Sequence, residues 1–542
     1  MELREAAGSR MEVVGGGQRA RRARPPAAIL APAALVGMGM FIPIAYLVLR
    51  TLGAGAEVFD LLFRSRTLEI LVRSGLLAAA VAGASVAIAA PLAWLTVRTD
   101  LPFRGVWSVV TALPLVIPSY VGGFLVVLAL GPRGMLQGWL EPLGVERLPE
   151  IFGFPGAAMT LTLLSYPYVL LPVRAALGSL DPSLEETSRL LGRGAWATFF
   201  KVTLPLLRPA IAAGALLAAL YTLSDFGAVS LLQYETFAWA IYIQYGYFAR
   251  DLAAALSLVL VALALSILVF EARARGRAAY YRNATGAVRP PPAVRLGRWR
   301  WPALAFCFSI ALLSLVMPMS VLGYWVVRGV SAGEPLLSLW SQARNSLYVS
   351  GLAALVTVLA AVPIATLVVR YPGRLSSLLE RFTYLGFALP GVVVALALVF
   401  FGARVATPLY QTLSLLIFAY MALFLPTAVG AIRSSLLQVD PALEEAARSL
   451  GRTPFRALLA VTVPLARPGI LAGAALTFLL TMKELPATLI LSPIGFKTLA
   501  TSVWGAAEEG FFTQAATGGL LLILASAAPM AFLILRGERR GW

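Results

Sequence analysis

One polar stretch occurs twice in this chain, as Asp181-Pro-Ser-Leu-Glu-Glu-Thr-Ser-Arg-Leu-Leu-Gly192 and as Asp440-Pro-Ala-Leu-Glu-Glu-Ala-Ala-Arg-Ser-Leu-Gly451. The copies lie 259 residues apart, and this spacing holds without a gap as far as Gly214 and Gly473. The segments around them, 174–208 and 433–467, are termed the duplicated loops. A charged loop that occurs twice in a very hydrophobic protein predicts two equivalent docking points for a symmetric partner.

The composition is that of a membrane protein. Hydrophobic residues make up 59% of the 542 residues and the mean hydropathy is +0.82. Apolar runs of about 20 residues, each long enough to cross a bilayer, recur along the chain. The formal charge of +18 lies in short loops between these runs, which membrane topology explains better than nucleic-acid binding does. We therefore expect a lipid bilayer and no nucleic acid among the partners.

Histidine is absent and Cys307 is the single cysteine, within an apolar run. A disulfide within the chain is therefore impossible, and imidazole or thiolate metal cages are excluded, so no metal site is expected. A histidine base or a Cys–His pair cannot carry catalysis here, and no catalytic residue is predicted. Cys307 is interpreted as a small buried hydrophobe.

Basic residues indicate how the chain is oriented in the membrane. With the N-terminus inside, 32 of the 44 lysines and arginines fall on the inner side, which places both termini and both duplicated loops in the cytoplasm. Residues 1–27, rich in glycine and arginine, are expected to form a disordered cytoplasmic tail. Twelve spans are expected, near 27–49, 69–97, 107–130, 157–173, 209–232, 252–270, 302–327, 345–369, 383–402, 408–432, 468–492 and 514–535.

A second repeat supports two equivalent halves. Pro91–Arg98 matches Pro363–Arg370, and Pro118 matches Pro390, at a spacing of 272 residues. We expect an all-α integral membrane protein with two pseudo-symmetric six-helix halves, related by an axis along the membrane normal. The first half is 28–271, the cytoplasmic linker 272–300 and the second half 301–542.

Each duplicated loop carries helix signals. Asp181 and Asp440 precede prolines and are expected to cap helices, while glutamates follow in the first turns, where they favour the helix dipole. Gly192 and Gly451 lie where each helix would end, in a left-handed conformation. A second short helix is expected before Pro205 and Pro464. Each loop would thus form a helix–turn–helix that projects from the membrane.

These residues resemble the permeases of ATP-binding cassette (ABC) importers of the binding-protein-dependent, type I family. That family carries a loop of pattern E-A-A, three residues, G, nine residues, I, any, L, P. Glu186-Thr-Ser…Gly192…Val202-Thr-Leu-Pro205 fits it, as does Glu445-Ala-Ala…Gly451…Val461-Thr-Val-Pro464. The resemblance implies a type I permease fold in a bacterial cytoplasmic membrane. It also implies ATPase coupling through Glu185, Glu186, Gly192, Pro205, Glu444, Glu445, Gly451 and Pro464.

The resemblance further implies partner proteins. Two copies of an ABC ATPase subunit would bind the loops, and an extracytoplasmic substrate-binding protein would deliver the solute. The chain has three lysines, none preceded by glycine, so it lacks a P-loop. We expect no cofactor on this chain and no enzymatic activity of its own, with ATP and magnesium held by the ATPase subunits.

Ionisable residues inside expected spans point to a solute pathway. Asp225 and Glu484 occupy equivalent positions on the fifth helices, with Lys483 beside Glu484. They could line the path of a cation, or cap a broken helix. Outside the membrane, Tyr234, Trp239, Tyr242 and Trp504 are expected either to shape an outer gate or to form an interfacial aromatic belt.

The stretches that begin at Asp225 and at Lys483 look like those of fused iron(III) permeases, which implies iron(III) uptake. Thiamine and phosphonate permeases share the fused layout and stay as alternatives. A secondary transporter with six plus six helices is the rival class, but it has no use for two ATPase-docking loops. A membrane-embedded enzyme would need paired metal ligands or a nucleophile–base pair, and the sequence offers neither.

Overall fold

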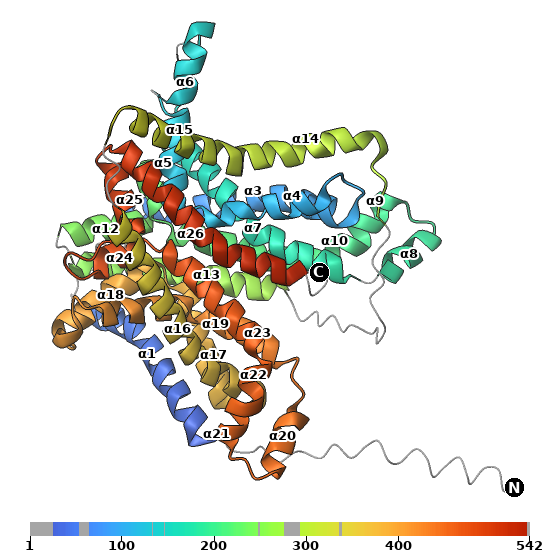
Figure 1. The fold of residues 1–542 in the computed structure, drawn as a ribbon, viewed down its shortest axis with the longest axis vertical. Coiled ribbons are helices and arrows are strands. Elements are labelled where there is room, and N and C mark those ends of the chain that lie inside the picture. Colours follow the sequence, from blue (N-terminus) through green and yellow to red (C-terminus); the bar gives the residue numbers. More distant parts are fainter. Residues whose placement is uncertain are drawn as a thin grey trace, which may run out of the picture.

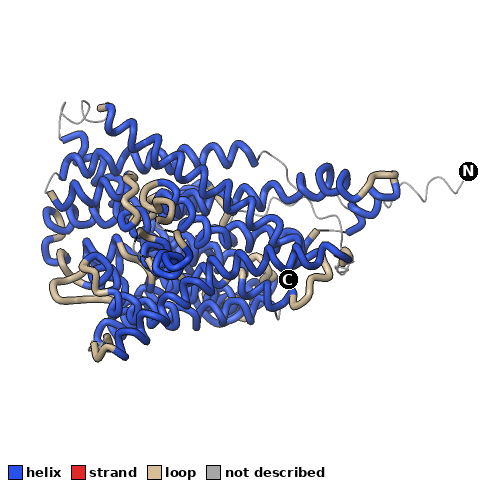
Figure 2. Tube along the Cα trace, turned by 90° about the horizontal axis from the view of Figure 1, so that it is seen from above, coloured by secondary structure: helices blue, strands red, loops and turns tan. Residues whose placement is uncertain are grey.

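The computed structural model describes residues 25–53, 64–132, 134–145, 147–180, 182–247, 250–275, 293–334 and 339–538. In these ranges the chain is helical, and its one bridge of β type joins Thr99 to Val294. Helices joined by short loops fill the molecule (Figure 2). Residues 1–24 of the expected tail and 276–292 of the expected linker lie outside the described residues.

The order of long helices follows the predicted halves. Ten described helices are long and apolar enough to cross a membrane, and a bent pair, Phe455–Leu465 with Arg467–Met482, makes an eleventh. A shorter apolar helix, Gly391–Arg404, stands at the third position of the second half. The main helices of the first half are α1 (Ala27–Gly53), α3 (Ser65–Arg98), α5 (Ser119–Leu130), α7 (Phe154–Ser179), α10 (Leu204–Ser224) and α13 (Arg250–Arg275). Those of the second half are α14 (Arg300–Ala311), α15 (Met317–Ser331), α16 (Trp340–Arg370), α18 (Gly391–Arg404), α19 (Leu413–Leu436), α23 (Arg467–Met482) and α26 (Phe512–Glu538).

The third expected span of each half, at 107–130 and at 383–402, is interrupted at a proline. In the first half α4 (Arg104–Val110) and η1 (Leu113–Val116) end before Pro118, and α5 begins after it. In the second half α17 (Arg374–Ala388) ends before Pro390, and α18 follows. Proline lacks an N–H and disfavours helix at the residue before it, so each apolar run changes direction there.

The fifth spans also end earlier than expected. Helix α10 stops at Ser224 and α23 at Met482, and short helices α11 (Gly227–Leu231) and α24 (Pro486–Leu491) follow. The ionisable residues therefore occupy the breaks rather than helix interiors. Such a break leaves backbone groups without helical partners, which a membrane protein tolerates only where the break lines a cavity or is buried in protein.

Two helix bundles form the body, and in each of them a helix from one half of the sequence packs against helices of the other half. Helices α3, α7 and α10 pack together, as do α16, α19 and α23. However, α1 packs on α16, α17 and α18 of the second half, while α15 packs on α5 of the first (Figure 1). Gly214 allows α10 to approach α7, because a Cβ there would lie 2.6 Å from Val169 Cα. Gly473 plays the same part between α23 and α19.

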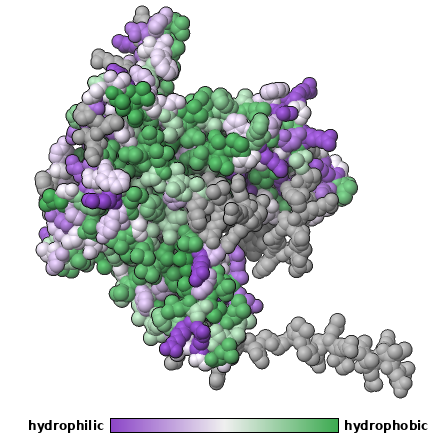
Figure 3. All heavy atoms as spheres, viewed as in Figure 1, coloured by the Kyte–Doolittle hydropathy of each residue, from purple (hydrophilic) through white to green (hydrophobic). Residues whose placement is uncertain are grey.

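The surface separates apolar from polar regions. Apolar side chains cover the broad middle of the molecule, as a lipid-facing surface requires (Figure 3). Polar side chains gather near α8 (Pro182–Leu190) and, at the other loop, near α20 (Pro441–Ser449). The molecule therefore has an α8/α20 side, and an opposite side that carries α12 (Phe237–Gly246) and α25 (Leu499–Glu508).

Candidate functional site: two projecting loops and a central cavity

Both duplicated loops fold in the same way. Helix α8 is followed by α9 (Ala195–Thr198) and the π-helical turn η3 (Phe199–Thr203), which runs into α10. Helix α20 is followed by α21 (Pro454–Ala457), the π-helical turn η7 (Leu458–Thr462) and α22 (Val463–Leu465). Both loops project from the body (Figure 1). The second short helix expected in each loop is therefore present, joined to the fifth span through a π-turn.

The helix caps follow the sequence signals. Asp440 Oδ1 accepts the Ala442 N–H at 2.9 Å, which caps α20. Asp181 lies outside the described residues. Gly192 and Gly451 have φ of 80° and 85°, the left-handed conformation expected. A Cβ at either glycine would meet no atom within 4 Å, so a substitution would strain the backbone without a clash inside the chain.

The paired glutamates of each loop point in different directions. Glu186 and Glu445 are exposed. Glu185 instead accepts a hydrogen bond from Arg98 Nη2 at 3.2 Å, and its side chain is 20% exposed. Glu444 likewise accepts from Arg370 Nε at 2.8 Å. The second glutamate of each pair is therefore the one exposed at the projecting surface.

The prolines of the loops lie at matched positions in helices of different shape. Pro205 lies in the first turn of α10, and Pro464 in that of α22. In the second half, the chain bends by 72° between Leu465 and Arg467. The first half continues as one span over Phe199–Ser224. The two loops thus have the same local fold but join their bundles at different angles.

Apolar side chains stand exposed at the tips of both loops. Leu191 is 74% exposed and its counterpart Leu450 is 86% exposed, while Leu184 and Leu443 are about half exposed. They lie in α8 and α20 or directly after these helices, among the charged residues of the duplicated loops. Matched exposed leucines on a charged helix are typical of a protein-binding surface.

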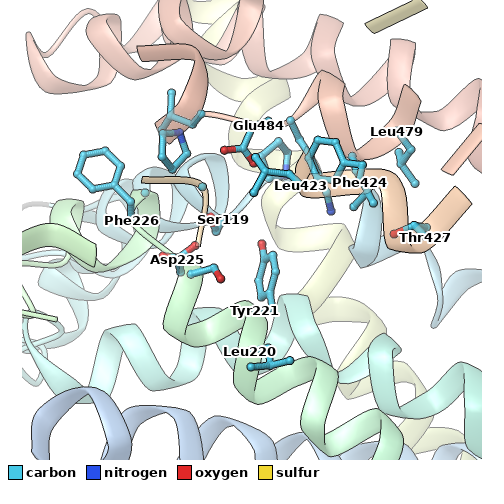
Figure 4. Close-up of a pocket in the computed structure, with 18 of the residues that line it drawn as sticks. Ser119, Leu220, Tyr221, Asp225, Phe226, Leu423, Phe424, Thr427, Leu479 and Glu484 are labelled. Atoms are coloured by element: carbon cyan, nitrogen blue, oxygen red, sulfur yellow. The ribbon is translucent and has the colours of Figure 1, made fainter. Parts of the chain in front are cut away.

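A cavity of about 340 Å³ lies where the halves meet, lined by the breaks in the third and fifth spans (Figure 4). Asp225, Lys483 and Glu484 all line it, so the structure brings together the three ionisable residues picked from the sequence. Its remaining wall is mostly apolar, with several leucines and the rings of Tyr120, Tyr168, Tyr221, Phe226 and Phe424. A mainly apolar chamber with a few convergent polar groups is the usual form of a small-ligand site.

The two carboxylates are held differently in the two halves. Asp225 accepts the Ala228 N–H at 3.0 Å, and Ser119 lies next to it (Figure 4). Glu484 accepts the Ala487 N–H at 3.2 Å. The counterpart of Ser119 is Gly391, and a Cβ there would collide with Glu484 Oε1. The longer acid therefore occupies the space that the serine side chain fills in the first half.

Lys483 links the halves across the cavity. Its Nζ donates to the Leu115 carbonyl at 2.9 Å and lies 5.9 Å from the centroid of the Tyr221 ring. Both partners belong to the first half. Tyr120, 2% exposed, also lines the cavity, and its hydroxyl has no hydrogen-bond partner among the described residues. The cavity thus offers a buried phenol that a bound molecule could engage.

An aromatic cluster lies beside the cavity, formed by Phe226 of its wall and by one residue each of α12 and α25. Phe226 contacts Tyr242 with ring centroids 4.5 Å apart, and Trp504 of the other half at 5.0 Å. Tyr242 and Trp504 thus contact the same ring, and their role as an outer gate stays a prediction. Tyr234 packs instead on Phe154, at 5.7 Å, and the partly buried Trp239 packs against the hydrophobic core.

Sequence reasoning missed Phe226, Ser119, Gly391, Tyr120 and Leu115. Phe226 directly follows Asp225, and Ser119 and Gly391 directly follow the matched prolines, so the repeats carried a signal for these three. Nothing in the sequence pointed to the Leu115 carbonyl or to the Tyr120 hydroxyl. Within the described part of the chain, no group of three or more His, Cys, Asp or Glu could hold a metal ion.

Comparisons with known proteins agree with this arrangement. Residues 85–274 and 353–536 each match the family model described as binding-protein-dependent transport system inner membrane component. The chain is 37% identical over 519 residues to the Fe(3+)-transport system permease protein FbpB 2 of Haemophilus influenzae, covering 94% of this chain and 98% of that protein. It is 26% identical to the ferric transport system permease protein FbpB of Actinobacillus pleuropneumoniae, over 80% of this chain and 66% of that protein. The molybdenum transport system permease ModB of Escherichia coli is 37% identical over 25% of this chain and 58% of its own length.

Proposed function

Because this chain belongs to the family of binding-protein-dependent transport system inner membrane components, we propose that it forms the translocation pathway of an ABC importer for iron(III). The assignment of iron(III) as the cargo rests on the similarity to an Fe(3+)-transport permease along 98% of that protein. The cavity shared by the two halves supplies a place for a small cargo midway along the path.

Two ATPase subunits would bind the two duplicated loops. The support is the matched pair of projecting helices, each with an outward glutamate and exposed leucines. Gly192 and Gly451 end these helices with open space around them, which leaves room for a partner to approach closely. ATP and magnesium would be held by those subunits, and this chain would bind no cofactor.

The α8/α20 side would face the cytoplasm of a bacterium, with both termini on that side. The excess of basic residues in the loops of this side supports the orientation. The α12/α25 side would then receive a substrate-binding protein. The cluster of Phe226, Tyr242 and Trp504 would act as the outer gate, since Phe226 lines the cavity and contacts one aromatic residue of α12 and one of α25.

The cavity chemistry favours a cation over an oxyanion. Asp225 and Glu484 contribute carboxylates and Tyr120 and Ser119 contribute hydroxyls, the oxygen ligands that hard cations prefer. Lys483 is the one cation among the lining residues, and it is already hydrogen-bonded to the Leu115 carbonyl. This arrangement suits iron(III) or cationic thiamine better than phosphonate or molybdate.

Reconstitution tests the proposal. The chain is purified together with an ABC ATPase and an iron(III)-binding protein from the same organism, placed in vesicles loaded with ATP, and supplied with radioactive iron(III) on the binding protein. We expect ATP-dependent iron accumulation that excess thiamine or molybdate does not reduce. Competition by thiamine would shift the cargo to that vitamin. Uptake by the chain alone, without ATPase subunits, would refute the importer assignment in favour of a secondary transporter.

A further inference from the structure

The ion pairs between the loops and the second helix of each half form a matched set. Arg98 is the last residue of α3 and Arg370 the last of α16. Each bonds a first-turn glutamate of the following loop helix, Glu185 or Glu444. The two arginines are 272 residues apart and the two glutamates 259. The segment that joins the arginine to the glutamate therefore differs in length between the halves, yet the ion pair is present in both.

These pairs are shielded from solvent. The side chains of Arg98 and Arg370 are 5% and 9% exposed, and both glutamates are 20% exposed. Removing a guanidinium from water is costly, and a buried ion pair adds little net stability compared with apolar packing. What such a pair does supply is a directional contact with a fixed geometry.

The loop helices have few other ways to act on the body. The packing contacts of α8 are with α9 and η3, and those of α20 are with α21 and η7. Each set of neighbours includes a π-helical turn, η3 or η7, a rare element that is found mostly at functional sites. Sharp helix kinks occur at such turns, so a push that passed only through η3 or η7 would be taken up by bending there.

The ion pair provides a second route from each loop helix to its bundle, beside the path through the π-turn; in the first half Glu185 also accepts a hydrogen bond from Thr203 Oγ1 of η3, at 2.8 Å. Arg98 and Arg370 end the helices that pack on α7 and α10 and on α19 and α23, respectively. In the first half the C-terminal end of α3 is also held by two hydrogen bonds from the segment just before α14. Val294 N donates to the Arg98 carbonyl at 2.8 Å, and Leu296 N donates to Asp100 Oδ1 at 2.8 Å, just before α14.

We propose that Arg98–Glu185 and Arg370–Glu444 are force-transmitting braces, which make each bundle rotate as one body when an ATPase subunit moves its loop. Arg98 and Arg370 are positioning residues that act through the loops and touch neither cargo nor nucleotide. The inference rests on the proposed function, since it needs a motor bound at the loops. It adds the residues through which the motion enters the membrane domain.

The test replaces all four residues by leucine in the assembled complex (Arg98→Leu, Glu185→Leu, Arg370→Leu and Glu444→Leu). Removing both partners leaves no unpaired buried charge, so the chain is expected to fold and insert. The matched control is Arg66→Leu with Glu235→Leu, an ion pair of 2.8 Å near α12. Three quantities are measured: ATPase subunits copurified, ATP hydrolysed, and iron(III) transported per ATP.

We expect the quadruple variant to bind its ATPase subunits and hydrolyse ATP, but to transport about tenfold less iron per ATP. The control should keep the wild-type ratio. An unchanged ratio in the quadruple variant would overturn the proposal, and so would loss of ATPase binding, which would make the pairs part of the docking surface. A wild-type complex that fails to couple transport to ATP would instead refute the proposed function.

Discussion

The sharpest prediction concerns the space shared by residues 391 and 484, where a small residue stands beside a long acid. In the first half Ser119 stands beside Asp225, and in the second half Gly391 makes room for the longer Glu484. Gly391→Ser should force the Glu484 carboxylate out of place, because the added Cβ would collide with its Oε1. Overpacking costs about 1–3 kcal/mol. The displaced Glu484 would also lose the hydrogen bond that it accepts from the Ala487 N–H, and the loss of this helix cap costs about 0.5–2 kcal/mol.

The double variant Gly391→Ser with Glu484→Asp reproduces the pair of the first half and should recover most of this loss. Together the two terms for Gly391→Ser amount to roughly 1.5–5 kcal/mol, and the coupling between the positions should be about 1–3 kcal/mol. The assay is the thermal midpoint of each purified variant in detergent, followed by iron uptake in vesicles. Gly430→Ser is the control, because a Cβ there would meet no atom within 4 Å.

Additive effects would refute the reasoning. If the double variant is as unstable as the sum of its single changes, the two positions do not share one space. If Gly430→Ser is as harmful as Gly391→Ser, the loss reflects serine in a membrane helix and not the collision with Glu484.

Three further changes test the cavity, the gate and the loops. Lys483→Met removes the bond to the Leu115 carbonyl, and it should loosen the contact between halves, raising ATP hydrolysis without cargo while lowering uptake. Phe226→Ala removes the ring shared by Tyr242 and Trp504, and it should let small ions leak from vesicles without ATP, as measured by dye release. Gly192→Val forces a β-branched residue into φ of 80°, at a cost of about 1–2 kcal/mol, and should reduce uptake more than ATP hydrolysis.

Each of these outcomes has a clear opposite. Wild-type hydrolysis and uptake in Lys483→Met would show that the bond to Leu115 has no part in transport. If vesicles that contain the Phe226→Ala variant do not leak, the barrier to ions lies at other residues than Phe226. Proportional loss of uptake and hydrolysis in Gly192→Val would indicate weaker ATPase binding and not uncoupling.

Repetition in the sequence predicted the local structure of the loops well. The glycine caps at 192 and 451 and the Asp440 cap depend on neighbouring residues alone, so a repeat at constant spacing conveys them. It could not tell which of two adjacent glutamates faces inward. Adjacent helix residues point about 100° apart, and the inward direction is set by Arg98, a residue far away in the chain.

Hydropathy located the spans but not their breaks. Residues on both sides of Pro118 and Pro390 are apolar, so each run resembles one helix until the backbone is traced. The sequence left the role of Asp225 and Glu484 open between a solute path and a helix cap; the structure shows the cap, and the path stays a prediction. Each caps a short helix and lines the cavity, because a break in a membrane helix needs acceptors for its free N–H groups.

The exchange of first helices between the bundles bears on biosynthesis. Helix α1 finds much of its packing surface on α16, α17 and α18, which the ribosome makes hundreds of residues later. Until these helices are made, the face of α1 that packs on them has no partner in the protein, and the N-terminal half cannot complete its native packing. Fusing both portions in one polypeptide keeps the late surface tethered nearby, so maturation does not depend on a chance encounter in the membrane.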